Sequence, residues 1–195
     1  MADDLTDVAL SGLTPERATR VRDLIAEVPD FPAPGILFKD ITPLLADAGG
    51  LADVVEVFTR LAGDVGGVDL VAGMEARGFL LGAPVAHALG LGFLPLRKAG
   101  KLPPPTESVS YDLEYGSASI ELRSGTLTPG ARVLVIDDVL ATGGTAAAAA
   151  ELVERCGGTV AGLAFLLELE ALHGRDRLKG HKVDTLLRVG TSSGE

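Results

Sequence analysis

The segment VLVIDDVLATGGTA, residues 133–146, constrains the fold of this 195-residue chain more than any other segment. Its first four residues are apolar and mostly β-branched, which is typical of a buried strand. Two adjacent carboxylates, Asp137 and Asp138, follow, and a turn of small residues then leads into an alanine run that favours helix. Amides and the dipole at a helix start attract phosphate, while carboxylates bind sugar hydroxyls directly or through a metal ion. The segment therefore predicts a strand–helix junction that holds a sugar phosphate.

The same residues also have a purely structural interpretation, in which the two carboxylates cap a turn that the glycines form. We favour the functional interpretation because adjacent carboxylates repel each other unless a cation or a hydroxyl group lies against them. The patterns GxxxxGK[ST] and GxGxxG are absent, so the segment predicts neither a P-loop nor a dinucleotide site. The phosphate would be bound by backbone amides and two hydroxyls in the turn, from Ala141, Thr142, Gly143, Gly144 and Thr145.

The apolar pattern over the rest of the chain predicts strands that alternate with helices. Strands are expected at 68–72, 92–96, 133–136, 160–167 and 183–189, helices at 15–28, 51–62, 79–89 and about 145–156, and a β-hairpin at 111–123, whereas the proline-containing residues 31–43 are expected to be irregular. This order predicts an α/β fold with a mostly parallel, twisted sheet flanked by helices. Ligands in such sheets lie beyond the carboxyl ends of the strands, so the loops after residues 72, 96 and 136 are expected to form one site.

Composition excludes several classes of protein. The net charge of −10 argues against a nucleic-acid partner, which requires a basic face. Cys156 is the only cysteine, which rules out an intrachain disulfide. No apolar stretch approaches the roughly 18 residues of a membrane span, and the acidic N-terminus MADDLTD does not resemble a signal peptide. We expect a single cytoplasmic domain without a membrane or nucleic-acid partner.

Four segments together resemble the type I phosphoribosyltransferases, and among them the adenine phosphoribosyltransferases. DDVLATGGT resembles the motif for 5-phosphoribosyl-1-pyrophosphate (PRPP), FPAPGILFKDITPLL the base-binding hood, GMEARGFLLG the pyrophosphate loop, and RKAGKLPPPTESVSYDLEYG the flexible lid with the strand that carries the catalytic glutamate. The similarity extends from about Phe31 to Leu178 in the family's order and spacing. It implies one domain over 1–195, with a hood at about 1–45 plus 166–190, a core at about 50–165 and a lid loop at about 97–110.

The resemblance also implies an activity, which is transfer of the phosphoribosyl group from PRPP to adenine, giving AMP and pyrophosphate in purine salvage. A magnesium ion and a homodimer belong to the same expectation. The 5′-phosphate would lie on residues 141–145, and Asp137 and Asp138 would face the ribose hydroxyls or the magnesium ion. The leaving pyrophosphate would be bound by four cations, Arg77, Arg97, Lys98 and Lys101, although the last three could also form an ordinary solvated loop. A cis peptide bond is expected between Glu75 and Ala76.

The acceptor side of the expected site depends most on the resemblance. Glu114 would act as the acid near N7 of adenine, and Tyr115 would pack beside the ribose. Phe38 and Leu166 would stack on the two faces of adenine, and the backbone of Leu37 and Lys39 would read its Watson–Crick edge. Taken alone, Glu114 is more typical of an exposed strand residue and Phe38 and Leu166 are more typical of core, whereas Tyr115 fits core and a binding role equally well. Lys39 stands where many family members have arginine, and the prolines at 103–105 predict a stiff lid.

Two other functions fit parts of this pattern. A related enzyme that uses xanthine, hypoxanthine or guanine would need a cation near the 6-oxygen of the base. A non-catalytic PRPP-sensing domain of a transcription regulator would carry a basic DNA-binding domain, for which 195 residues leave no room. We expect the adenine enzyme.

Overall fold

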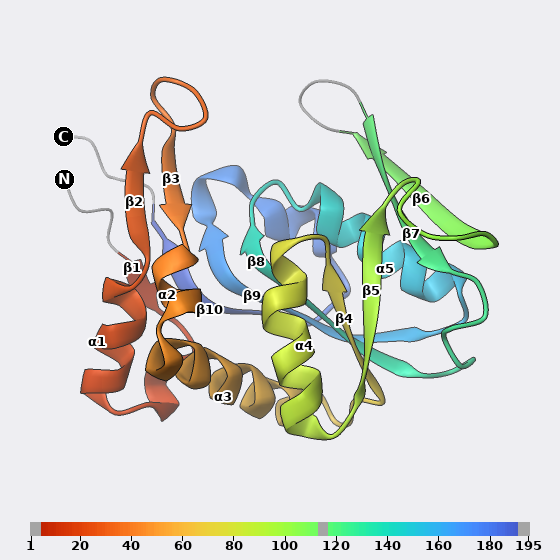
Figure 1. The fold of residues 1–195 in the computed structure, drawn as a ribbon, viewed down its shortest axis with the longest axis horizontal. Coiled ribbons are helices and arrows are strands. Elements are labelled where there is room, and N and C mark those ends of the chain that lie inside the picture. The colour runs from red at the N-terminus through yellow and green to blue at the C-terminus, as the bar shows by residue number, and fades with distance from the viewer. Residues whose placement is uncertain (1–4, 113–116, 191–195) are drawn as a thin grey trace.

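The structure is a computed structural model that describes residues 5–112 and 117–190. Within these ranges an eight-stranded sheet is accompanied by a separate two-stranded sheet (Figure 1). The strands are β1 (Leu5–Asp7), β2 (Ala26–Pro29), β3 (Leu37–Asp40), β4 (Leu70–Met74), β5 (Gly92–Lys98), β6 (Thr106–Asp112), β7 (Ser117–Arg123), β8 (Arg132–Leu140), β9 (Thr159–Leu169) and β10 (Val183–Val189). The α-helices are α1 (Pro15–Asp23), α2 (Thr42–Ala46), α3 (Ala48–Asp64), α4 (Arg77–Leu89) and α5 (Gly144–Arg155), with short 3-10 turns η1 (Leu10–Gly12), η2 (Glu170–Leu172) and η3 (Gly174–Leu178).

The large sheet has the strand order β1-β10-β9-β8-β4-β5-β7-β6. Its five central strands, from β10 to β5, are parallel to one another, and β1, β7 and β6 add antiparallel pairs at the two sides. The predicted mostly parallel sheet is therefore confirmed. The topology brings the carboxyl ends of β4, β8 and β9 to the same edge of the sheet, which is where ligands bind in folds of this class.

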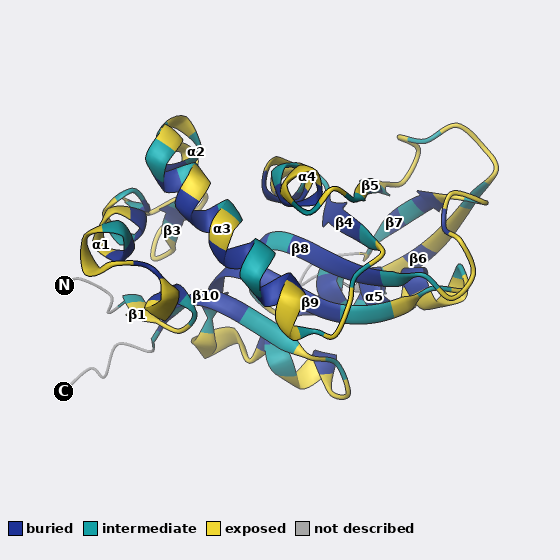
Figure 2. Cartoon of the chain, turned by 90° about the horizontal axis from the view of Figure 1, so that it is seen from below, coloured by how far each residue is buried: buried dark blue, intermediate teal, exposed yellow. Residues whose placement is uncertain are grey.

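Helices cover both faces of this sheet. Alternate residues of β8 enter two separate hydrophobic clusters, because side chains of a strand point to opposite faces. Leu134 and Ile136 pack with α1, α3 and α4, whereas Val133 and Val135 pack with α5 and the β6–β7 hairpin. Figure 2 shows the central strands as mostly buried between these two layers. Burial on both faces explains why β8 reads as a continuous apolar run in the sequence.

The N-terminal part differs from the prediction. The helix expected at 15–28 ends at Asp23, and residues 26–29 form β2, which pairs antiparallel with β3. The segment 31–43, expected to be irregular, contains the strand Leu37–Asp40 and the start of α2. Apolar residues at 21, 24, 25 and 28 fit a helical face, but the strand partner at 37–40 lies far enough away in sequence to be invisible to local periodicity. The prolines lie outside β3, so they do not prevent it.

The remaining predicted elements are confirmed with shifts of a few residues. The helices at 51–62, 79–89 and 145–156 correspond to α3, α4 and α5, and the expected hairpin corresponds to β6 and β7. The end of α5 is followed by Gly157 at φ 84°, a left-handed conformation that glycine adopts readily and that commonly ends a helix. No helix in the described part of the chain is long and apolar enough to cross a membrane.

Candidate active site

The acid pair lies at the carboxyl end of the sheet, inside β8. The strand was expected to stop at Ile136, but it continues to Leu140. Asp137 and Asp138 therefore lie within the last four residues of β8. Gly78 at the start of α4 allows the helix to approach this point, because a Cβ atom added there would lie 2.7 Å from the Ile136 carbonyl oxygen and 3.0 Å from Asp137 Oδ1. Because Gly78 has no side chain, the first turn of α4 can pack closely against the acid pair.

The two carboxylates are poorly compensated. Asp138 is 3% exposed, and Asp137 is half-buried and accepts the Asp138 amide at 2.9 Å. Burial, reinforced by the charge of Asp138, raises the pKa of Asp137 well above its usual range. Burial also raises the pKa of Asp138, although Arg77 opposes this shift. The buried Asp138 Oδ2 is the oxygen that Arg77 Nε contacts in an ion pair, and among the described residues no aligned hydrogen bond supplements that contact.

Arg77, which was predicted to bind pyrophosphate, lies between the acid pair and the two-stranded sheet. Its guanidinium forms an ion pair with Asp138 and stands 5.7 Å from the centre of the Phe38 ring. The Arg77 side chain is 46% exposed, so water and a competing anion can reach it. Its position places an accessible cation beside the acid pair.

The turn after β8, Ala141–Thr145, is called the phosphate loop below. Gly143 has φ 80° and is the N-cap of α5, whose axis starts at Gly144. A small pocket of about 70 Å³ is lined by the whole phosphate loop together with Asp137, Val139 and other residues. The predicted strand–turn–helix junction is confirmed, and its backbone geometry is the one in which helix N-termini bind phosphate.

A second cavity, the hood groove, lies beside this pocket. It has a volume of about 310 Å³ and is lined by Ile36, Leu37, Phe38, Lys39, Arg77, Asp137, Asp138, Val139, Ala141, Thr145 and Leu169. Leu37, Phe38 and Lys39 are thus brought to the site as predicted. Leu166 is not: it is fully buried in the core between the sheet and α3. The sequence prediction of Leu166 as a stacking residue is wrong, and β9 contributes Leu169 instead.

The Lys39 side chain occupies a defined place in the small sheet. It is buried, and its Nζ donates to Glu27 Oε1 at 2.5 Å across the β2–β3 pair. This ion pair compensates the ammonium charge beneath the groove. Lys39, at the position where many family members have arginine, is therefore neutralised by Glu27 on the paired strand.

The lid cations begin at the end of β5. Arg97 donates to Glu75 Oε2 at 3.0 Å, the Lys98 amide donates to the same oxygen at 2.9 Å, and these two bonds lower the pKa of Glu75. The side chains of Lys98 and Lys101 are exposed. The Glu75–Ala76 peptide bond is cis, as predicted. Glu114 and Tyr115 lie outside the described residues.

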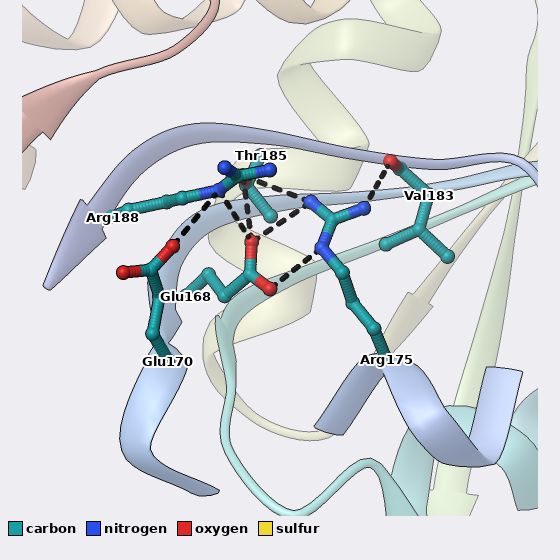
Figure 3. Close-up of polar contacts among 6 residues, drawn as sticks. All are labelled: Glu168, Glu170, Arg175, Val183, Thr185 and Arg188. Carbon is teal, nitrogen blue, oxygen red and sulfur yellow. Dashed lines mark hydrogen bonds and ion pairs between the residues drawn. The ribbon is translucent and has the colours of Figure 1, made fainter. Parts of the chain in front are cut away.

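A buried polar cluster that sequence reasoning missed lies next to the phosphate loop. Glu168, near the end of β9, is 5% exposed and accepts hydrogen bonds from Arg175, Thr185 and Arg188 (Figure 3). Burial alone would raise the pKa of Glu168, but the two arginines and Thr185 lower it below its usual value. An isolated glutamate in an apolar strand pattern is a detectable signal for such a cluster, because glutamate is rarely buried unless paired.

Fold and site define a phosphoribosyltransferase. The sequence model described as "Phosphoribosyl transferase domain" matches residues 48–191, which is more than half of the chain. An adenine phosphoribosyltransferase of Nocardioides sp. is 59% identical over 169 residues, covering 85% of this chain and 91% of the relative.

Solved structures agree with the sequence relatives. The adenine phosphoribosyltransferase of Thermoanaerobacter pseudethanolicus is similar at 48% identity with a TM-score of 0.82, over 88% of this chain and 99% of the other. That of Saccharomyces cerevisiae, crystallised with adenine and an imino-alditol bisphosphate, is 38% identical with a TM-score of 0.84, over 88% and 98% of the two chains. The chain belongs to the adenine phosphoribosyltransferase family.

Proposed function

We propose that this protein transfers the 5-phosphoribosyl group of PRPP to adenine and releases AMP and pyrophosphate, a reaction of purine salvage. The observation that carries the proposal is the junction of two cavities: Asp137, Val139, Ala141 and Thr145 line both the phosphate-loop pocket and the hood groove. A ligand that fills both must carry a phosphate at one end and a flat, partly apolar group at the other. A nucleoside monophosphate has this shape, with its ribose over the acid pair.

The donor would bind through the phosphate loop and the acid pair. The amides of the phosphate loop and the hydroxyls of Thr142 and Thr145 would bind the 5′-phosphate. Asp137 and Asp138 would bind the ribose hydroxyls and stabilise positive charge that develops on the ribosyl carbon. Arg77, Arg97, Lys98 and Lys101, proposed to bind the leaving pyrophosphate, would neutralise its charge.

Magnesium fits this site as a companion of PRPP. The described residues hold no cluster of three metal-ligating side chains, so the protein supplies two carboxylates and the substrate supplies further oxygens. Burial raises the pKa values of both Asp137 and Asp138, and the ion pair of Asp138 Oδ2 with Arg77 is not supplemented by an aligned hydrogen bond among the described residues, so a further cation would stabilise the two ionised carboxylates. Bound there with Asp137 or Asp138 as ligand, the ion would neutralise negative charge on the pyrophosphate group of PRPP.

The acceptor would lie in the hood groove. Phe38 would stack on one face of adenine, Leu169 with Val139 would provide the apolar surface on the other side, and the backbone at Leu37 and Lys39 would read the base edge. Glu114 is proposed as the acid at N7, with Tyr115 beside the ribose. A homodimer and a cytoplasmic location complete the proposal.

Product formation from PRPP with four bases, adenine, guanine, hypoxanthine and xanthine, tests the function. We expect AMP from adenine and less than about a hundredth of that rate from each 6-oxopurine, because the unmet hydrogen bonds of a wrong base edge are costly. A rate with any 6-oxopurine that exceeds the rate with adenine would contradict the proposal.

The role of Glu114 is tested by a single substitution. Glu114→Leu should lower kcat by about 100-fold with little change in AMP binding, and an unchanged kcat would remove Glu114 from the mechanism.

A further inference from the structure

The Glu168 cluster joins three segments of the chain. Arg175 of η3 reaches Glu168 with two parallel hydrogen bonds, Nε to Oε1 at 2.6 Å and Nη2 to Oε2 at 2.8 Å. The same guanidinium donates from Nη1 to the Val183 carbonyl oxygen of β10 at 2.8 Å. Figure 3 shows Arg175 pointing from η3 toward Glu168, near the carboxyl end of β9, and toward Val183, the first residue of β10. A guanidinium with this many fixed partners determines the position of the backbone that carries it.

That backbone packs directly on the phosphate loop. Gly174 precedes Arg175, and a Cβ atom added at Gly174 would lie 2.2 Å from the Ala141 carbonyl oxygen and 3.1 Å from the Gly143 nitrogen. Conversely, a Cβ atom added at Gly143 would lie 2.3 Å from the Gly174 carbonyl oxygen. The two turns are therefore in backbone-to-backbone contact, and a shift of η3 must be transmitted to the phosphate loop.

The phosphate loop and the Glu168 cluster both begin at one pair of neighbouring residues in the sheet. Glu168 is the register partner of Leu140, the last residue of β8 before the phosphate loop. The carboxylate of Glu168 is thus fixed relative to the start of the loop, and through Arg175 it fixes the turn that covers the loop. Arg175 is not among the residues that line the phosphate-loop pocket or the hood groove, so its effect on a ligand is indirect.

We propose that Glu168 and Arg175 are positioning residues for the 5′-phosphate: they hold Gly174 against Ala141 and Gly143 and so set the shape of the phosphate loop. The inference rests on the proposed function, in which this loop binds the phosphate of PRPP and AMP. It assigns to the pair an effect on phosphate-bearing ligands and none on the base or on proton transfer. A purely structural role would change stability without this selectivity.

The chain offers a matched control for the test. Arg17 binds the buried carboxylate of Asp53 at 2.6 Å, and its side chain is 33% exposed, against 36% for Arg175. Arg17 and Asp53 connect α1 with α3 and line neither cavity. Arg175→Lys and Arg17→Lys therefore remove the same chemical feature, a guanidinium on a buried carboxylate, at two different places.

The measurements are the KM for PRPP, the KM for adenine, kcat, and the dissociation constant of AMP by calorimetry. For Arg175→Lys we expect the KM for PRPP and the dissociation constant of AMP to rise about 10-fold, with kcat and the KM for adenine within about two-fold of the original protein, because small misplacements of a binding group cost this much or more. Arg17→Lys should leave all four unchanged. Glu168→Gln should reproduce the Arg175→Lys pattern.

A second variant keeps the test decisive if the cluster variants do not fold. Gly174→Ala leaves Glu168 and Arg175 intact and pushes directly on Ala141, so it should give the same selective loss. Equal losses for PRPP and adenine, or unchanged PRPP and AMP affinities in a folded Arg175→Lys protein, would overturn the inference. Failure of the proposed function would be visible separately, since the original protein would then form no AMP and bind none.

Discussion

Two acidic groups lie at the carboxyl ends of the adjacent strands β8 and β9, and they are compensated in opposite ways. Glu168 accepts hydrogen bonds from two arginines and a threonine, which lower its pKa. Asp137 and Asp138 share one arginine, and burial raises the pKa of both. The protein thus neutralises the carboxylate that it uses for its own structure and leaves the other pair under-compensated. The difference indicates where positive charge or hydroxyl groups must come from a ligand.

The contrast extends to the pH dependence of stability, and the signs are opposite. The folded pKa of Glu168 lies below its unfolded value, so its ionisation stabilises the fold above about pH 4.3, and this contribution is lost as the pH falls through the folded pKa. The folded pKa of Asp137 lies above its unfolded value. Its contribution is therefore present at low pH and is lost as the pH rises from about 3.9 through the folded pKa.

Removing charge from the under-compensated pair should have the largest effect on binding. The double variant Asp137→Asn, Asp138→Asn should lose Mg·PRPP affinity by about 100-fold or more, which corresponds to about 2.7 kcal/mol. The reason is that both carboxylates would contact the sugar or its ion. Calorimetric titration with Mg·PRPP measures the loss, and Asp53→Asn, a buried carboxylate outside the site, is the control. Binding at the original affinity would remove the acid pair from the donor site.

Removing the compensated carboxylate should act on stability rather than on binding. Glu168→Ala leaves Arg175 and Arg188 without their buried partner, and we expect the free energy of unfolding to fall by about 3 kcal/mol at neutral pH. Denaturant unfolding measures this change. Glu170→Ala, which loses an exposed contact with Arg188 at 3.6 Å, should cost less than about 1 kcal/mol. Similar losses in the two variants would show that the buried Glu168 cluster contributes no more to the free energy of unfolding than an exposed ion pair does.

Neutralising Asp137 alone should stabilise the ligand-free protein, and this change in the free energy of unfolding should be the smallest of the three effects. Because burial disfavours its ionised form, Asp137→Asn should raise the free energy of unfolding of the ligand-free protein by about 1 kcal/mol and the melting temperature by about 3 °C. Thermal unfolding by calorimetry at neutral pH checks both values. Asp184→Asn, whose contact with Lys182 is 3.7 Å long, should leave the melting temperature unchanged. A destabilised Asp137→Asn protein would contradict the account of under-compensation.

The comparison also explains which parts could be predicted from sequence. The strand, acid pair, glycine turn and helix at 133–146 are consecutive in the chain, so local pattern was sufficient to predict β8, the phosphate loop and α5. The hood depends on pairing between β2 and β3 and the Glu168 cluster on contacts between β9, η3 and β10, which no local periodicity encodes.

The error at Leu166 has a specific physical cause. The apolar run of β9 continues through Leu167 and, after Glu168, ends at Leu169, so the sequence does not mark where the strand reaches the site. The position of Leu166 inside the strand places it in the core, whereas Leu169, the last residue of β9, reaches the hood groove. A ligand beyond the carboxyl end of a strand is contacted by the strand's last residues rather than by its middle.

The central claim, that the two acidic groups are compensated in opposite ways, is tested most directly by a carbon-13 NMR titration of side-chain carboxyls in the ligand-free protein. The resonances are assigned by their absence in Asp137→Asn and Glu168→Gln. We expect Asp137 to titrate above the ordinary aspartate pKa of about 3.9 and Glu168 below the ordinary glutamate pKa of about 4.3. Ordinary values for both groups, or the reverse order of shifts, would contradict the account.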